Sequence, residues 1–358
     1  MYSSFHIKNF RGFTDFEIDG LQRINLIAGR NNTGKTSLLE AIFIHTNQYV
    51  YAILNSQSAR GVEIATYDNT MAPWQSIFHK LDVTKNVEIQ SKSNGKIASI
   101  SISDESNSEK FSMAKKKYYT QKSTDAYNTH DPKDIRLLNL WKSESQNLRS
   151  GSQTLFQDRT GYTVDPITAS SINSVKFIDA HHRPTSSDIA SYFSHLVRSK
   201  NEKFLINAIQ IIDSRLQSLD VLFSNTVPIM YADITLDQLI PLNALGDGIV
   251  RLTNILLQIG VNENGIILID EIENGFHYSI LPQVWKAIAQ AARDFDVQIF
   301  ATTHSLEMIR AAHEAFKDQD PYDFAYHRLD RGNAGKIIAK TYDEETLEAS
   351  IDMNFEVR

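Results

Sequence analysis

The sequence predicts an α/β fold in which a mainly parallel sheet with flanking helices is joined to an antiparallel β lobe. Three observations lead to this prediction. Strands and helices alternate through the second half of the chain, as in parallel sheets with right-handed crossovers. A glycine-containing loop between an apolar strand and a helix lies near the N-terminus, and two alternating runs nearby are typical of a β-hairpin.

The first segment, residues 1–105, is expected to form a lobe built on strands. The runs "SSFHIKNF", "TDFEIDG" and "INLIAG" predict two strands and a return, and "SLLEAIF" places apolar residues on one helical face. "VEIQSK" and "KIASISIS" alternate around Ser93-Asn94-Gly95, which predicts a hairpin. Residues 106–173 turn polar and lose periodicity, so we treat them as an insertion of unknown structure.

The second segment, residues 174–358, alternates between the two kinds of element. Expected strands are "SVKFIDA", "PIMYADI", "DQLIPL", "GIILIDEI" and "VQIFATTHS", and "DFAYHRL" with "GKIIAKTY" predicts a closing hairpin. Expected helices are "NEKFLINAIQIIDSRLQSL" over 201–219, "GDGIVRLTNILLQIG" and "YSILPQVWKAIAQAARDF". No repeats and no heptads long enough for a coiled coil occur.

The loop "GRNNTGKT" matches the phosphate-binding pattern G-x-x-x-x-G-K-[ST]. Its backbone N–H groups and the start of the following helix would surround phosphates, while Lys35 would reach the β and γ phosphates and Thr36 would ligate Mg²⁺. The residues expected to contact the nucleotide here are Gly29, Arg30, Asn31, Asn32, Thr33, Gly34, Lys35, Thr36 and Ser37.

Two later strands end in polar residues. Asp270 and Glu271 follow Ile266–Ile269, and His304 follows the strand over 298–301. Ligands gather at the carboxyl ends of parallel strands. Asp270 therefore suits a Mg²⁺ contact, Glu271 a general base that polarises water, and His304 a contact to a γ-phosphate or the attacking water.

A second anion site is expected at "LNALGDGIVRL", where Gly246 and Gly248 flank Asp247 at the start of a helix. Two phosphate-binding helix starts in one chain could hold one nucleotide between two subunits that meet head to tail.

The order of these motifs resembles that of ABC-type ATPase heads: Walker A loop, signature helix, Walker B strand with a following glutamate, and switch histidine. "FHIKNFRGFTDFEIDGLQRINLIAGRNNTGKTSLLEAI" resembles the RecF/SMC branch, and "IDEIENGFH" with "ALGDGIVRL" resembles compact ATPases related to the OLD family of anti-phage and toxin-type operons. OLD nucleases carry a Toprim domain after the ATPase, and the 54 residues after His304 (358 minus 304) are too few for one.

The resemblance implies ATP and Mg²⁺ as cofactors and assigns further residues. Lys35, Thr36, Asp270, Glu271 and His304 keep the roles given above, Arg11 of "NFRGF" matches an arginine near the nucleotide, and Gln75 is a candidate for the metal-contacting glutamine. The fold implied is an ABC ATPase head with a helical signature subdomain. One departure is Gly246, which stands where transporter-type signatures have serine, and this affects the expected rate more than binding.

The resemblance also implies a homodimer or higher oligomer that switches an effector protein, a nuclease or toxin. The alternatives are a transporter ATPase subunit, a DNA-repair head and an ATP sensor with little turnover. No N-K-x-D element for guanine occurs, so ATP is the expected nucleotide.

Composition limits the choice of function. The net charge of −7 argues against a surface devoted to nucleic acid, so any DNA contact needs a local patch. "KKKYY" at 115–119 is either such a patch or an edge strand guarded by lysines. The absence of cysteine, of a signal peptide and of a long apolar run leads us to expect a cytoplasmic protein without a membrane span.

Overall fold

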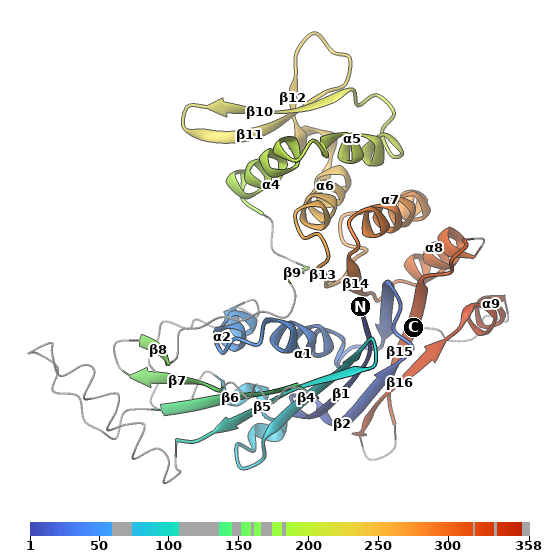
Figure 1. Cartoon of the computed structure of the whole chain (residues 1–358). Helices are drawn as coiled ribbons and strands as arrows, with labels where there is room; N and C mark the ends of the chain where they lie inside the picture. Colours follow the sequence, from blue (N-terminus) through green and yellow to red (C-terminus); the bar gives the residue numbers. More distant parts are fainter. Residues whose placement is uncertain are drawn as a thin grey trace, which may run out of the picture.

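The computed structural model describes residues 1–58, 74–106, 136–144, 152–158, 161–165, 174–180, 184–317, 319–332 and 335–352. Within them the predicted α/β architecture is confirmed: an antiparallel sheet and a mostly parallel sheet enclose a helix, and further helices cover the outer face of the parallel sheet (Figure 1). The expected "KKKYY" patch lies outside the described residues. Among those described, no helix is both long and apolar enough to cross a membrane.

The antiparallel sheet has the strand order β2-β1-β4-β5-β6-β7-β8. Its strands are β1 (Tyr2–Phe10), β2 (Phe13–Asp19), β4 (Val87–Ser93), β5 (Lys96–Asp104), β6 (Arg136–Glu144), β7 (Ser152–Asp158) and β8 (Gly161–Asp165). The predicted β4–β5 hairpin is confirmed, and its turn residues Asn94 and Gly95 have the positive φ angles of 49° and 74° that such a turn requires. Strands β6–β8, from the segment that we treated as an insertion, extend this sheet.

The second sheet has the order β16-β15-β3-β14-β13-β9, and all its strands except β16 run parallel. Its strands are β3 (Ile24–Gly29), β9 (Val175–Ile178), β13 (Ile266–Ile269), β14 (Gln298–Thr302), β15 (Phe324–Arg331) and β16 (Ile337–Tyr342). Because β3, β13 and β14 are neighbours and parallel, the residues that follow them meet at one edge.

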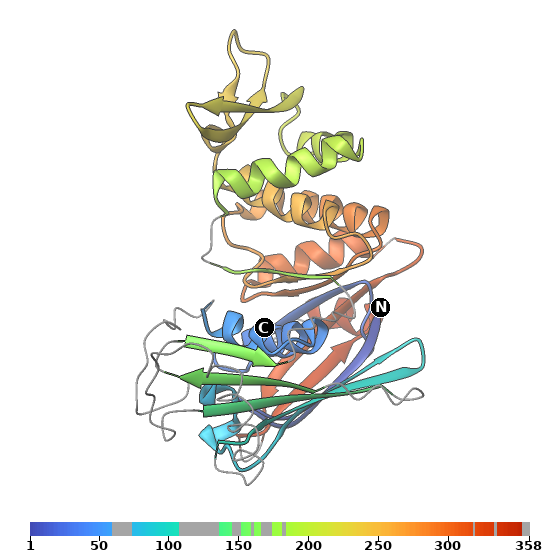
Figure 2. The same ribbon diagram turned by 60° about the vertical axis from the view of Figure 1, so that its left-hand side comes forward.

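Helix α1 (Lys35–Asn47) lies between the two sheets, as Figures 1 and 2 show, and is followed by α2 (Tyr51–Ser58). Leu38 and Ile42 pack with residues of both sheets, among them Phe5 and Phe300. The helix is therefore buried on more than the single face that its sequence predicted. The short 3-10 helices η1 (Gln75–Ile77) and η2 (His79–Leu81) follow in the same lobe.

The opposite face of the parallel sheet carries helices α6 (Asp247–Gly260), α7 (Leu281–Asp294) and α8 (Leu306–Phe316). Alternate residues of β13 separate the two cores: Ile266 and Leu268 face α1, whereas Ile267 and Ile269 face these helices. Helix α9 (Glu344–Asp352) follows β16. The helices cover the sheet on the side away from the antiparallel lobe (Figure 2).

A smaller subdomain stands beyond α6 (Figure 1). It contains α4 (Ser186–Arg198), α5 (Glu202–Gln210) and a sheet of β10 (Ser218–Ser224), β11 (Val227–Asp233) and β12 (Ile240–Pro241). The 3-10 helix η4 (Leu242–Leu245) leads from β12 into α6, so the subdomain is attached directly to the predicted signature loop.

Two sequence predictions in this subdomain were wrong in extent. The helix expected over 201–219 ends at Gln210, because the Asp213 carboxylate accepts a hydrogen bond from the Arg215 backbone N–H (3.1 Å) and forms a turn before β10. Leu216 and Leu219 are buried as expected, but they lie outside the helix. The strand expected at "DQLIPL" pairs only over Ile240–Pro241, and Leu242 begins η4.

Candidate active site

The phosphate-binding loop connects β3 to α1, as predicted. Gly34 precedes the helix with a φ angle of 93°, which favours glycine. Gly29 is also restricted, because a β-carbon there would lie 2.5 Å from the carbonyl oxygen of Leu329. Arg30, Asn31 and Asn32 are exposed, whereas Thr33 is buried and its hydroxyl donates to the Arg30 carbonyl at 2.8 Å. Ser37, also expected at the site, is half-buried in the first turn of α1.

The Lys35 side chain folds back onto its own loop. Its Nζ donates to the carbonyl oxygens of Gly29 at 2.7 Å and Arg30 at 3.1 Å. Only 6% of the residue is exposed, and burial lowers the pKa of Lys35 to about 8 although Asp270, Glu271 and Glu273 oppose the shift. The two carbonyl contacts hold the ammonium where phosphate oxygens could replace them.

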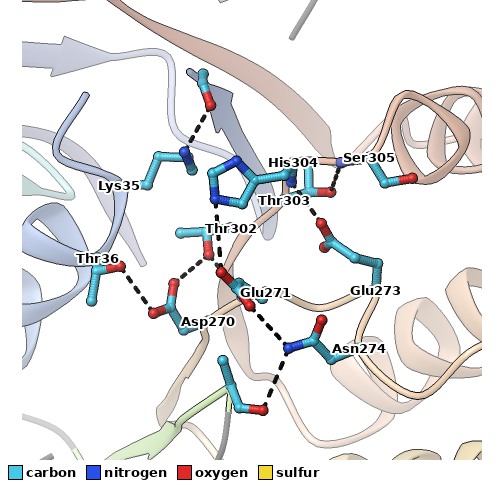
Figure 3. A network of polar contacts seen from close by, with 12 residues as sticks. Lys35, Thr36, Asp270, Glu271, Glu273, Asn274, Thr302, Thr303, His304 and Ser305 are labelled. Carbon is cyan, nitrogen blue, oxygen red and sulfur yellow. Dashed lines mark hydrogen bonds and ion pairs between the residues drawn. The ribbon is translucent and has the colours of Figure 1, made fainter. Parts of the chain in front are cut away.

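Thr36 and Asp270, which are 234 residues apart in sequence, are in contact. The Thr36 hydroxyl donates to Asp270 Oδ2 at 2.9 Å, and the Thr302 hydroxyl donates to Asp270 Oδ1 at 2.5 Å (Figure 3). Thr302 Oγ1 also accepts a hydrogen bond from the Glu271 backbone N–H at 2.9 Å. The end of β14 therefore fixes both acidic residues that follow β13.

Glu271 lies beside His304. Its Oε1 is 3.8 Å from His304 Nε2, and its Oε2 accepts a hydrogen bond from the Asn274 amide at 3.0 Å (Figure 3). The side chains of Glu271 and His304 are 35% and 36% exposed, so water can reach both. Glu271 has a positive φ of 47°, an unusual backbone conformation for a glutamate that turns the chain away from the strand.

The loop after β13 also holds His304 from the opposite side. The Glu273 carboxylate accepts a hydrogen bond from the His304 backbone N–H at 2.6 Å, and the Asn274 amide reaches the Ala180 carbonyl at 3.4 Å. The Ser305 N–H donates to Thr303 Oγ1 at 3.0 Å, which completes the turn after β14. These contacts order the peptide on which the histidine stands.

Gly246 precedes α6 with φ and ψ angles of 104° and 157°, a backbone conformation that residues other than glycine rarely adopt. No side chain caps the N-terminus of α6, and Gly246 and Asp247 are exposed. A serine at Gly246 would be strained in this conformation, which gives a physical reason for the departure noted in the sequence. Gly248 is half-buried and lies close to the next loop, where a β-carbon on it would be 3.1 Å from the Gly275 carbonyl oxygen.

Arg251, one turn into α6, joins that helix to the sheet. Its guanidinium donates to the carbonyl oxygens of Asp179 at 3.1 Å and Asp270 at 3.3 Å. Burial lowers the pKa of Arg251, with Asp179 and Asp270 opposing the shift. This arginine ties the start of α6 to the strand ends that carry the acidic residues.

Arg11 and Gln75, which the resemblance places near the nucleotide and the metal, stay predictions, and the structure shows their surroundings within the protein. The Arg11 guanidinium forms a buried ion pair with Glu40 of α1, with Nε 2.6 Å from Oε2. Gln75 begins η1, and the carbonyl oxygen of Ile77, at the end of η1, accepts a hydrogen bond from the Arg11 backbone N–H at 2.7 Å. In the described part of the chain, no side-chain contact joins Gln75 to Thr36 or Asp270.

Sequence reasoning missed several residues of the site. Thr302, Glu273, Asn274 and Arg251 receive no individual role in the sequence analysis. A threonine at the end of a strand next to the acidic strand is a weak signal, because threonine is common in strands. The contacts of Glu273 and Asn274 depend on how the loop folds back, which spacing alone does not reveal.

Comparison with known proteins gives a consistent result. Residues 24–310 match the family described as "AAA domain, putative AbiEii toxin, Type IV TA system". A Helicobacter pylori protein named "ATP/GTP phosphatase" is 24% identical over 97% of both chains. A Lactococcus lactis RecF, a DNA replication and repair protein, is 27% identical over 26% of this chain and 24% of its own.

Among solved structures, an SMC head bound to the C-winged helix domain of ScpA covers 98% of this chain and 99% of its own, with a TM-score of 0.50 and 12% identity. This likeness concerns the fold alone.

Proposed function

Because the chain belongs to the AAA domain family described above and is an ABC-type ATPase of the RecF/SMC branch, we propose that ATP is bound and hydrolysed at Lys35 and its neighbours. We further propose that two copies close head to tail on two nucleotides, and that this closure controls an effector protein.

One observation carries the proposed site: the hydrogen bond between Thr36 and Asp270. It brings the first turn of α1 against the end of β13, and Glu271 and His304 lie beside it. A nucleotide seated on the loop would thus have its terminal phosphate close to a carboxylate and an imidazole. A strand that merely ends in acidic residues would not need this arrangement.

The oxygens of Thr36 and Asp270 suit Mg²⁺. They are hard ligands, and their separation of 2.9 Å is close to the distance of about 3.0 Å between adjacent ligands of an octahedral ion with bonds of about 2.1 Å. No group of three or more acidic, histidine or cysteine side chains that could hold a metal occurs among the described residues, and Mg²⁺ with a bound nucleotide needs only one or two protein oxygens. When bound, Mg²⁺ would neutralise charge on the β and γ phosphates.

Hydrolysis requires a water next to the γ-phosphate. Glu271 can accept a proton from that water, and Asn274 holds the carboxylate in place through Oε2. His304 stands where it can donate a hydrogen bond to the phosphate or the water. Lys35 would leave the carbonyls of Gly29 and Arg30 and place its charge on the phosphates.

The N-terminus of α6 supports the dimer. Its backbone N–H groups have no side-chain cap, and Gly246 and Asp247 are exposed to solvent. An uncapped helix start binds anions. Facing the loop of a second copy, it would complete the site around that copy's γ-phosphate.

A role in a toxin–antitoxin system is supported by the family description, which gives the matched AAA-domain family itself as a putative toxin of such a system. The related SMC head was solved with a bound protein partner, which supports a partner here as well. The name of the Helicobacter pylori relative includes GTP, so we propose ATP as the main nucleotide and GTP as its competitor.

The test is the solution mass of Glu271→Gln with and without Mg²⁺-ATP. This change removes the general base but keeps the size of the side chain, so ATP should remain bound and the mass should double. Lys35→Ala combined with Glu271→Gln is the matched control and should stay monomeric. An unchanged monomer that binds ATP would contradict the head-to-tail dimer, and failure to bind ATP would contradict the site itself.

A further inference from the structure

The hairpin of β15 and β16 forms a wall against the phosphate-binding loop. The parallel pairing of β3 with β15 ends at Gly29 and Leu329, where the two backbones are so close that a β-carbon on Gly29 would meet the Leu329 carbonyl. Further along the loop, a β-carbon on Gly34 would lie 3.3 Å from the Ile337 side chain of β16. The loop is therefore shaped partly by residues about 300 positions away.

Arg331, the last residue of β15, reaches the apex of this loop. Its Nη2 donates to the Asn32 carbonyl oxygen at 2.8 Å. Asn32 has a φ of 61°, a left-handed conformation that asparagine tolerates better than most residues. This backbone conformation and the hydrogen bond from Arg331 together fix the orientation of the Asn32 peptide at the apex of the loop.

The Lys35 contacts of the loop are internal, and a bound nucleotide would compete for them. Arg30 O accepts hydrogen bonds from Thr33 Oγ1 at 2.8 Å and from Lys35 Nζ at 3.1 Å, and Gly29 O accepts one from Lys35 Nζ. Phosphate oxygens would compete for Lys35, so its two contacts would be lost. Arg331 holds a carbonyl from outside, and nothing about phosphate binding requires that contact to break.

We propose that Arg331 is a positioning residue for the nucleotide: it holds the apex of the loop in its phosphate-binding shape while Lys35 changes partners. Its positive charge beside the loop also favours an anionic ligand. This inference rests on the proposed nucleotide site and adds to it a residue outside every motif recognised in the sequence.

The test measures ATP affinity by equilibrium titration, together with kcat and KM, for Arg331→Ala and Arg331→Lys. Loss of one exposed charged hydrogen bond should weaken ATP binding and raise KM by about 5- to 20-fold, with kcat within about twofold. Arg331→Lys keeps a cationic donor and should recover most of the affinity. Lys340→Ala is the matched control, because it removes an exposed cation that pairs with Asp330 on the same hairpin.

Each outcome is decisive. Wild-type affinity in Arg331→Ala, with binding lost in Lys35→Ala, would overturn the inference and leave the proposed site intact. Equal weakening in Lys340→Ala would also overturn it, because the effect would then be one of general charge. A fall in kcat without a change in KM would contradict a positioning role in binding. If the wild-type chain bound no nucleotide, the proposed function itself would fail.

Discussion

Replacing Thr302 with valine tests whether β14 holds the acidic residues of the site. Thr302 is fully buried, and its hydroxyl both donates to Asp270 Oδ1 at 2.5 Å and accepts from the Glu271 N–H at 2.9 Å. Valine has nearly the same shape, so packing in the sheet is kept while both hydrogen bonds are removed. The change is therefore specific for the polar contacts.

The structure gives an estimate of the cost. A hydrogen bond to a charged acceptor contributes about 1.5–3 kcal/mol and a neutral one about 1 kcal/mol. Asp270 is half-buried, so water can replace part of the lost contact, and we expect a loss of about 2–3 kcal/mol in the free energy of unfolding. If the same amount is lost from the transition state, kcat falls about 30- to 150-fold, since 1.36 kcal/mol corresponds to a factor of ten.

The assay compares Thr302→Val with Thr302→Ser, which keeps the hydroxyl and removes only a methyl group. Steady-state ATPase kinetics should show a large fall in kcat for valine and a small one for serine, and urea unfolding should rank stability in the same order. If the valine variant kept its kcat and its stability within about 0.5 kcal/mol, the hydroxyl would not position Asp270 and Glu271.

Three further variants or conditions test single features of the site. Burial lowers the pKa of Lys35 to about 8, and bound phosphate favours the protonated amine, so ATP affinity should fall as the pH rises through 8. Binding near that pH should take up a proton, which calorimetry in buffers of different ionisation enthalpy would detect. An ATP affinity that is constant between about pH 7 and about pH 9.5 would contradict this prediction. In Gly246→Ala the new β-carbon meets no atom within 4 Å, but alanine is strained at a φ of 104°, so the free energy of unfolding should fall by about 1–3 kcal/mol. Analytical ultracentrifugation should show a weaker ATP-dependent dimer, while ATP binding to the monomer is unchanged. Arg251→Lys cannot bridge the Asp179 and Asp270 carbonyls with one ammonium group as the guanidinium does, so kcat should fall about tenfold in the ATPase assay, and Arg251→Ala should fall further.

Much of the fold could be predicted because local sequence and long-range packing agree. The Asn94-Gly95 turn requires positive φ angles that this pair adopts readily, and the four apolar residues of β13 suit a strand buried on both faces. The helix predicted over 201–219 was too long because local sequence and long-range packing disagree there. Its apolar spacing fits a helix, but the Asp213 turn interrupts it, and burial of Leu216 is achieved without helical geometry.

The candidate site shows the same division. Lys35, Thr36, Asp270 and Glu271 were predictable because each follows a strand at the edge where ligands gather. Arg331 was not, since it belongs to the last described hairpin and reaches Asn32 only through the parallel pairing of β15 with β3. Which strands are neighbours is a property of the whole sheet, and no local pattern around Arg331 contains it.

The loop after Glu271 connects the proposed hydrolytic residues to the proposed dimer surface. Asn274 holds the Glu271 carboxylate, and Glu273 holds the peptide of His304. The next residue, Gly275, packs against the start of α6, where a β-carbon on Gly248 would lie 3.1 Å from its carbonyl oxygen. Because the loop and the helix are closely packed here, we expect a shift of α6 against a second copy to move the loop. The residues to which we assign hydrolysis are thus in contact with the surface where we propose that a partner subunit binds, which is the arrangement that a nucleotide-driven switch requires.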